Sequence, residues 1–255
     1  MNILLAVAFL FLKTGERFAT QETAGPTVAE FTHYLGDYEP RVLNDPAKAV
    51  EFCTTKKPPI GIVTPGFYLA YAQALGIEPL LEVQRQKIPA EQFVLVVKKS
   101  ASDDPIALKG RSIATTLGAE QRYLLSVVLK NKLGEETRWK PVTDVEGAMF
   151  DLADGSTNAP NAVLVEEAAW KLFEKDEELG PKLKVVYRSD EVPHDLLVLF
   201  RPNAGNVEVE KLKSTLKDMG KNDAGRKILD SIRVEAFVEI DKDRLANAES
   251  LFYGK

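Results

Sequence analysis

The sequence predicts an α/β protein made of two doubly wound lobes, and three observations support this fold class. Short apolar runs typical of buried strands alternate with segments of helical spacing along most of the chain. The alternation breaks at residues 100–110 and then resumes as a second set, without a Pro-rich or low-complexity linker. The 255 residues are 45% hydrophobic and 28% charged, which is enough for the core of one large domain or of two smaller lobes.

The first set begins with an apolar run at residues 3–12. This run is too short to cross a bilayer and lacks both a basic stretch and a clear cleavage site, so we expect a buried strand rather than a signal peptide. Pro26 and the capping-box pair Thr27 and Glu30 predict a helix that ends near Gly36. The remaining elements of this set are strands at 41–44, 59–65, 78–86 and 91–99, and helices at 45–55 and from 65 to Gly76.

The second set follows a short helical turn that begins near Pro105 and ends at Gly110. Its expected elements are strands at 111–116, 138–143 and 183–189, helices at 118–133 and 145–155, and a strand running into a helix at 161–173. A strand at 194–203, helices at 207–222 and 223–232, and an apolar stretch at 233–240 complete the chain. Each set predicts a parallel sheet covered by helices on both faces, with the chain crossing between lobes near residues 96–100 and 189–196.

Composition narrows the class of partner. A net charge of −5 and the absence of a long Lys/Arg run argue against a nucleic-acid partner. Cys53 is the single cysteine, so a disulfide within the chain and Cys-rich zinc modules are excluded. We interpret Cys53 as a small buried apolar residue rather than a reactive thiol. A chain this poor in cysteine suits the cytoplasm or the bacterial periplasm.

Several segments, in their order and spacing, resemble a known family. They are "PIGIVTPGFYLAYAQALGIEPLLEVQR", "DPIALKGRSIATT", "NAVLVEE", "VPHDLLVLFRP" and "KSTLKDMGKNDAGRKIL". Together they resemble type II periplasmic binding proteins of the phosphate, phosphite and phosphonate branch, over nearly the whole chain. The resemblance implies a ligand cleft between two lobes, with lobe 1 at residues 1–97 plus 195–255 and lobe 2 at 98–194. The turn "ATTLGAEQRY" departs from the family pattern because it is poorer in Ser, and the family's second-lobe His is missing.

Candidate ligand contacts in lobe 1 follow two strands. Thr64 and Tyr68 stand where the strand at 59–65 turns into a helix, and ligands of open α/β sheets bind beyond the carboxyl ends of strands. The alternative is that Tyr68 packs on the lobe surface. Thr14 lies in the polar turn at residues 13–17, where Lys13 or Arg17 could help to neutralise an anion or could be ordinary loop charges.

Candidate contacts in lobe 2 are Thr115, Thr116 and Gly118, whose hydroxyls and amides would grip an oxyanion or simply cap a helix. Glu166 could accept a hydrogen bond from a protonated phosphonate or an amine, or it could serve as a helix N-terminal charge, as could Glu167. His194, beside Asp195 at the return crossing, could donate to an anion or could pack at a hinge.

The favoured function is the solute-binding component of an ABC importer. The resemblance implies a monomer that binds a small ligand, an oxyanion such as phosphate or a phosphonate, and that works with a membrane permease. We expect no cofactor, no metal and no catalysis. The expected location is periplasmic or extracytoplasmic with a lipid anchor, any signal peptide being absent from this chain. Two alternatives stay open: an enzyme on the same fold, such as a menaquinone-pathway-type dehydratase using His194, Asp195 or Glu166, and the sensor domain of a membrane receptor.

Overall fold

The computed structural model describes residues 7–17, 19–36, 38–85 and 87–254, and the chain divides into two compact units. Unit 1 comprises Met1–Pro89 and Pro193–Lys242, and unit 2 comprises Ala90–Val192 and Asp243–Lys255. The first division therefore falls before the strand at 91–99 rather than after it, because that strand hydrogen-bonds only to strands of unit 2 among the described residues. The C-terminal 13 residues of unit 2 were expected in lobe 1.

Unit 1 is built on a six-stranded sheet in the order β11-β4-β10-β3-β1-β2. β1 pairs in parallel with β2 and β3, whereas β10 is antiparallel to both β3 and β4. The expectation of an all-parallel sheet is therefore wrong, because the chain enters β10 at the edge where β3 and β4 end. The strands are β1 (Val7–Leu12), β2 (Tyr38–Leu43), β3 (Ile60–Val63), β4 (Ile77–Gln84), β10 (Asp195–Phe200) and β11 (Ala236–Val238). Residues 3–6 of the expected first strand lie outside the described residues.

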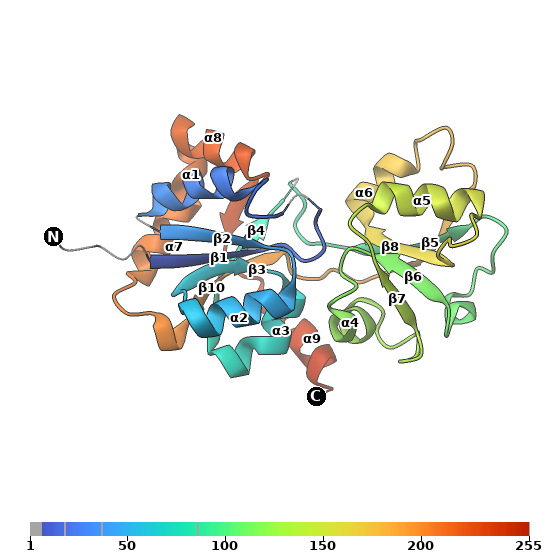
Figure 1. Cartoon of the computed structure of the whole chain (residues 1–255), viewed down its shortest axis with the longest axis horizontal. Coiled ribbons are helices and arrows are strands. Elements are labelled where there is room, and N and C mark those ends of the chain that lie inside the picture. Colours follow the sequence, from blue (N-terminus) through green and yellow to red (C-terminus); the bar gives the residue numbers. More distant parts are fainter. Residues whose placement is uncertain (1–6, 18, 37, 86, 255) are drawn as a thin grey trace. The chain divides into compact units, whose positions relative to one another are not determined.

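Helices cover both faces of this sheet (Figure 1). α1 (Gly25–Leu35), α7 (Val209–Asp218) and α8 (Asp223–Ser231) lie over one face, and α2 (Pro46–Lys56) and α3 (Pro65–Leu75) lie over the other. The core under α1 is aromatic: the Phe31 ring stacks on Phe237 at 5.8 Å and meets Phe9 edge-on at 5.9 Å. This packing fixes the sheet on which the strand-end turns are mounted. Two short 3₁₀ turns, Arg201–Asn203 and Met219–Lys221, connect the later elements.

Most helix ends of unit 1 agree with the sequence, including the end of α1 at Gly36. Asp45 caps α2 by accepting hydrogen bonds from the amides of Ala47 and Lys48, and Gly76 ends α3 with a φ of +61°, a conformation that suits glycine. The expected capping box of α1 is wrong, because the helix starts at Gly25 and places Thr27 inside its first turn.

Unit 2 is built on a five-stranded sheet in the order β7-β6-β8-β5-β9. β6 is parallel to β7 and β8, and β5 is antiparallel to β8 and β9, so this sheet is mixed as well. Met149, Leu152 and Trp170 from two helices pack on the sheet in one core. The elements are β5 (Phe93–Lys98), a 3₁₀ turn (Pro105–Leu108), β6 (Ser112–Thr115), β7 (Arg138–Pro141), α5 (Val145–Asp154), β8 (Ala162–Glu166), α6 (Glu167–Phe173) and β9 (Leu183–Arg188).

Two helical segments of unit 2 differ from expectation. The long helix expected at 118–133 is wrong: α4 (Gln121–Tyr123) leads directly into a π-helical turn (Leu124–Val128). Lys130 and Asn131 then adopt left-handed backbone angles, which end the helical path. An unexpected helix, α9 (Lys242–Tyr253), follows unit 1 in the sequence and buries Leu245, Ala248 and Phe252. Their spacing is helical, so the signal was present in the sequence.

Candidate functional site

The carboxyl edge of the unit 1 sheet gathers four chain segments. Phe11 of β1 pairs with Ile62 of β3, so these two parallel strands end side by side. Leu196 of β10 pairs with Val63, and Asp195 pairs with Val83 near the end of β4. The turns after β1, β3 and β4 therefore meet the start of β10, at the edge where open α/β sheets bind ligands.

A buried charge cluster occupies this edge. The Lys13 ammonium and the Arg85 guanidinium both contact the same oxygen of Asp195, Oδ2, at 3.2 Å and 3.1 Å. The Asp195 side chain is only 7% exposed, and those of Lys13 and Arg85 are 15% and 21% exposed. Burial by itself raises the pKa of Asp195, but the charges of Lys13 and Arg85 outweigh it and hold that pKa below its ordinary value. The carboxyl group is therefore ionised at neutral pH.

Thr64 and Tyr68, both expected to contact a ligand, lie at the start of α3. The Thr64 hydroxyl accepts a hydrogen bond from the Phe67 amide at 3.3 Å, and its carbonyl accepts one from the Tyr68 amide at 3.0 Å. Thr64 is thus the N-cap of α3. Tyr68 is 7% exposed, and the neighbouring Phe67 packs its ring against Tyr71 at 4.9 Å.

The turn after β1 contains two candidates that differ in their exposure, Thr14 and Arg17. Thr14 is 1% exposed, and the amides of Lys13 and Gly15 donate to the carbonyls of Leu43 and Asn44. These bonds tie the turn to the end of β2, so the base of the Lys13 side chain is well fixed. Arg17 is exposed, which suits the ordinary loop charge that the sequence allowed.

In unit 2, the turn after β6 does not open a long helix. Thr115 is 1% exposed and its hydroxyl accepts a hydrogen bond from the Leu117 amide at 3.4 Å, while Thr116 is half-buried. Gly118 has a packing reason that the sequence did not reveal, because a Cβ at this position would lie 2.9 Å from the Cα of Pro141 in β7. The glycine lets the turn approach the neighbouring strand.

The two glutamates at the end of β8 have different surroundings. Glu166, the last residue of the strand, is half-buried opposite Phe93 of β5. Glu167 begins α6 and forms ion pairs with Arg188 and, at 3.8 Å, with Lys171. The charge of Glu167 is compensated within unit 2, as expected for a helix N-terminal carboxylate.

His194 is completely buried, and its Nε2 lies 3.0 Å from the carbonyl oxygen of Ile88. Because that oxygen can only accept, the ring nitrogen donates. The contact joins the residue before β10 to the segment that follows β4. It matches the hinge-packing alternative, and a ligand contact by His194 stays a prediction.

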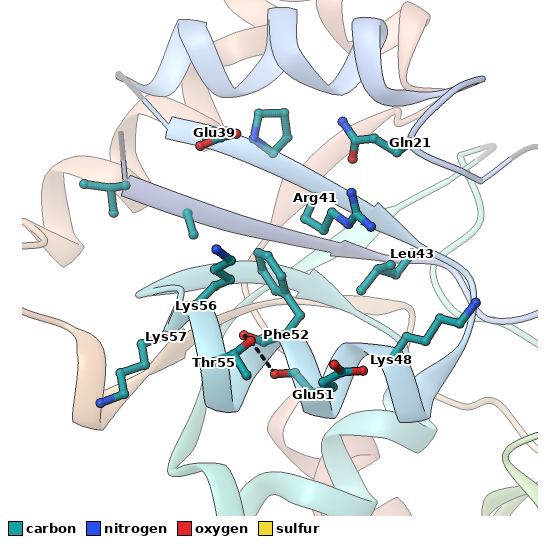
Figure 2. Close-up of a pocket in the computed structure, with 13 residues that line it drawn as sticks. Gln21, Glu39, Arg41, Leu43, Lys48, Glu51, Phe52, Thr55, Lys56 and Lys57 are labelled. Atoms are coloured by element: carbon teal, nitrogen blue, oxygen red, sulfur yellow. Dashed lines mark hydrogen bonds between the residues drawn. The ribbon is translucent and has the colours of Figure 1, made fainter. Parts of the chain in front are cut away.

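A separate groove lies along the outer strand of the unit 1 sheet (Figure 2). Its volume is about 920 Å³, and the labelled side chains come mainly from β2 and α2. It carries mixed charge, with Arg41 and Lys56 beside Glu39 and Glu51. None of the residues expected to bind ligand lines it, so it offers no support for the predicted site.

Metal-binding clusters and membrane-spanning helices are both absent from the described residues. Within residues 7–17, 19–36, 38–85 and 87–254, no group of three or more His, Cys, Asp or Glu side chains could hold a metal ion. In the same part of the chain, none of the helices combines the length and the apolar character that crossing a membrane requires.

Known proteins resemble this chain in sequence pattern and in fold. The family model for periplasmic phosphonate substrate-binding proteins of ABC transporters matches residues 19–245. Among solved structures, XAC2383 from Xanthomonas citri bound to ATP has a TM-score of 0.71 at 14% identity, covering 98% of each chain. PhnD1 from Prochlorococcus marinus in complex with methylphosphonate has a TM-score of 0.65 at 13% identity, covering 97% of each chain. A search of curated proteins finds no match.

A third similar structure is the binding component of an ABC phosphonate transporter from Pseudomonas aeruginosa. It has a TM-score of 0.67 at 16% identity, covering 96% of this chain and 85% of its own. At such identities the structures establish the two-lobed α/β fold, and the family model establishes the lineage. The family consists of substrate-binding proteins rather than enzymes, and its members bind small molecules and work with membrane permeases. This chain therefore belongs to the phosphonate family of periplasmic substrate-binding proteins of ABC transporters.

Proposed function

We propose that this protein binds a small oxyanion, phosphate or a phosphonate, as the extracytoplasmic substrate-binding component of an ABC importer. The observation that carries the proposal is the family match over residues 19–245, which includes both strand-end turns. The similar proteins support it, because XAC2383 is described with ATP and PhnD1 with methylphosphonate, both of which carry phosphorus oxyanions.

Two hydrogen-bonding turns are candidates in this proposal, and each lies within one unit. In unit 1, the start of α3 offers Thr64 and Tyr68, with the turn at Thr14 beside it in the sheet order. A helix N-terminus suits an anion because its first amides lack partners within the helix.

In unit 2, Thr115 and Thr116 supply hydroxyls, and Glu166 accepts a hydrogen bond from a protonated oxyanion oxygen. Gly118 shapes that turn through its approach to Pro141. His194 keeps its place in the proposal by holding the start of β10 against Ile88.

A thermal-shift screen tests the proposal. The unliganded protein is heated with phosphate, phosphite, methylphosphonate, sulfonates, amines or carboxylates. We expect an oxyanion to raise the melting temperature, because a ligand at 100 times its Kd stabilises the native state by about 2.7 kcal/mol. If no oxyanion shifts the melting temperature while an organic substrate is consumed, the dehydratase alternative replaces this proposal.

The same screen includes Tyr68→Phe, which removes the hydroxyl and keeps the ring. We expect weaker oxyanion binding with the melting temperature of the unliganded protein nearly unchanged. Tyr71→Phe, on the same helix, is the matched control and should bind normally. Tyr68→Ala is less suitable, because truncating an aromatic ring that is 7% exposed costs about 3 kcal/mol of stability.

A further inference from the structure

We propose that Lys13 and Arg85 contact the bound oxyanion, that Asp195 positions them, and that the charge of this cluster selects an oxyanion without an ammonium group. The inference rests on the proposed function and names the substrate class for the same edge of unit 1. Only His194 and Thr14 were expected to contribute from these segments, with Lys13 as a possible neutralising charge.

Position is the first step. Lys13 directly follows the end of β1, Asp195 is the first residue of β10, and Arg85 directly follows β4. In the sheet order, β3 lies between β1 and β10. Thr64, which follows β3 and caps α3, is therefore flanked by Lys13 at the end of β1 and by Asp195 at the start of β10. Two cations and a helix N-terminus are thus brought to one edge.

Orientation is the second step. Lys and Arg side chains lose substantial rotamer freedom when held in one place. Asp195 fixes both heads through a single oxygen, at 3.2 Å and 3.1 Å, before any ligand arrives. The Nε atom of Arg85 is buried without a hydrogen-bond partner among the described residues. Since Nε belongs to the planar donor fork that matches phosphonate oxygens, the guanidinium retains capacity for an anion.

Charge is the third step. Two cations face one carboxylate, so the cluster carries an excess of one positive charge. A second buried carboxylate, that of Glu82 on β4, accepts a hydrogen bond from the Asp241 amide at 3.0 Å. If Asp195 turned toward a ligand ammonium, Lys13 and Arg85 would lose their counter-charge at a partly buried position, which costs free energy. A ligand ammonium would instead meet Lys13 and Arg85.

Titration calorimetry with methylphosphonate as the probe tests the contacts. Lys13→Met and Arg85→Gln are expected to weaken binding by roughly 10- to 100-fold each, the range for hydrogen bonds to charged groups. Arg85→Lys keeps the charge and should recover part of the loss. Lys221→Met and Arg226→Gln are matched controls in unit 1, both at exposed ion pairs, and should change affinity less than twofold. Melting temperatures without ligand identify a variant that fails to fold, in which case Arg85→Lys carries the test.

Selectivity is measured on the native protein with ethylphosphonate and 2-aminoethylphosphonate, which differ by one ammonium group. We expect ethylphosphonate to bind more tightly, and the gap to narrow in Lys13→Met. Unchanged methylphosphonate affinity in both Lys13→Met and Arg85→Gln overturns the inference while leaving the proposed function intact, and so does tighter binding of 2-aminoethylphosphonate. Failure of the native protein to bind any oxyanion overturns the proposed function itself.

Discussion

At the scale of single residues, Asp195 is the most informative position. From the sequence, Asp195 was only a neighbour of His194 at the return crossing, and His194 was the expected ligand contact. The cluster could not be predicted from the sequence, because Asp195 lies 182 residues from Lys13 and 110 from Arg85, beyond any local pattern.

The state of Cys53 could be predicted from the sequence. The residue is buried, and burial raises the pKa of its thiol to about 12, as expected for an inert core residue.

Asp195→Asn should lower the free energy of unfolding by roughly 2–4 kcal/mol at neutral pH, because two partly buried cations lose their counter-charge. The native pKa of Asp195 is lowered, so its contribution is fully present above the unfolded pKa of about 3.9 and is lost as pH falls through the lower native pKa. Urea unfolding across pH measures this. The difference between native protein and variant should be constant above about pH 5 and shrink below about pH 4.

The control for that measurement is Asp218→Asn, which removes an exposed carboxylate paired with Lys221. Exposed pairs contribute little, so the control should follow the native protein at every pH. A stability difference for Asp195→Asn that stays the same down to strongly acidic pH would contradict the assignment.

At the scale of elements, most strands and helices follow from local signals. Alternation of apolar runs with helical segments located β3, β4, β5 and α2, α3, because the start at Asp45 and the stop at Gly76 are local features. The direction of β10 and β5 could not be predicted, since strand pairing is set by long-range topology. The candidate site was predicted as two strand-end turns, and the packing role of Gly118 depends on Pro141, 23 positions away in the sequence, beyond local patterns.

The caps of α2 and α3 provide a matched pair. Asp45→Ala and Thr64→Ala should each cost about 1 kcal/mol of stability, because each removes a side-chain acceptor at a helix N-terminus. Only Thr64→Ala should also weaken methylphosphonate binding, since only α3 starts at the carboxyl edge beside Lys13 and Asp195. Urea unfolding and titration calorimetry give the two quantities. Equal effects on affinity would show that α3 has no special part in binding.

At the scale of the whole molecule, each unit is assembled from two separate stretches of chain. Helix α9 joins unit 2 after the chain has completed unit 1. Arg122 anchors it, with its guanidinium 4.4 Å from the centre of the Phe252 ring and a hydrogen bond of 2.9 Å to the Phe252 carbonyl. The C-terminal helix is thus part of the support of α4, the segment that follows the turn at Thr115–Gly118.

Phe252→Ala should loosen unit 2 selectively, because the ring is buried and carries the cation–π contact with Arg122. Hydrogen exchange should show faster exchange at residues 121–128 with β1 and β3 unchanged. Leu172→Ala, also in unit 2, is the control, since that side chain is 71% exposed and its loss should have little effect. Equal acceleration in both units would contradict the division of the chain.

The place of β10 has a consequence for how the protein folds during synthesis. This strand lies between β3 and β4 in the sheet, yet it follows all five strands of unit 2 in the sequence. The emerging chain can therefore complete the five-stranded sheet while the six-stranded one still lacks an inner strand. Closing so long a loop is slow and exposes unpaired strand edges in the meantime. The edge that holds Lys13 and Arg85 is finished only when Asp195 arrives, so binding competence is acquired late in folding.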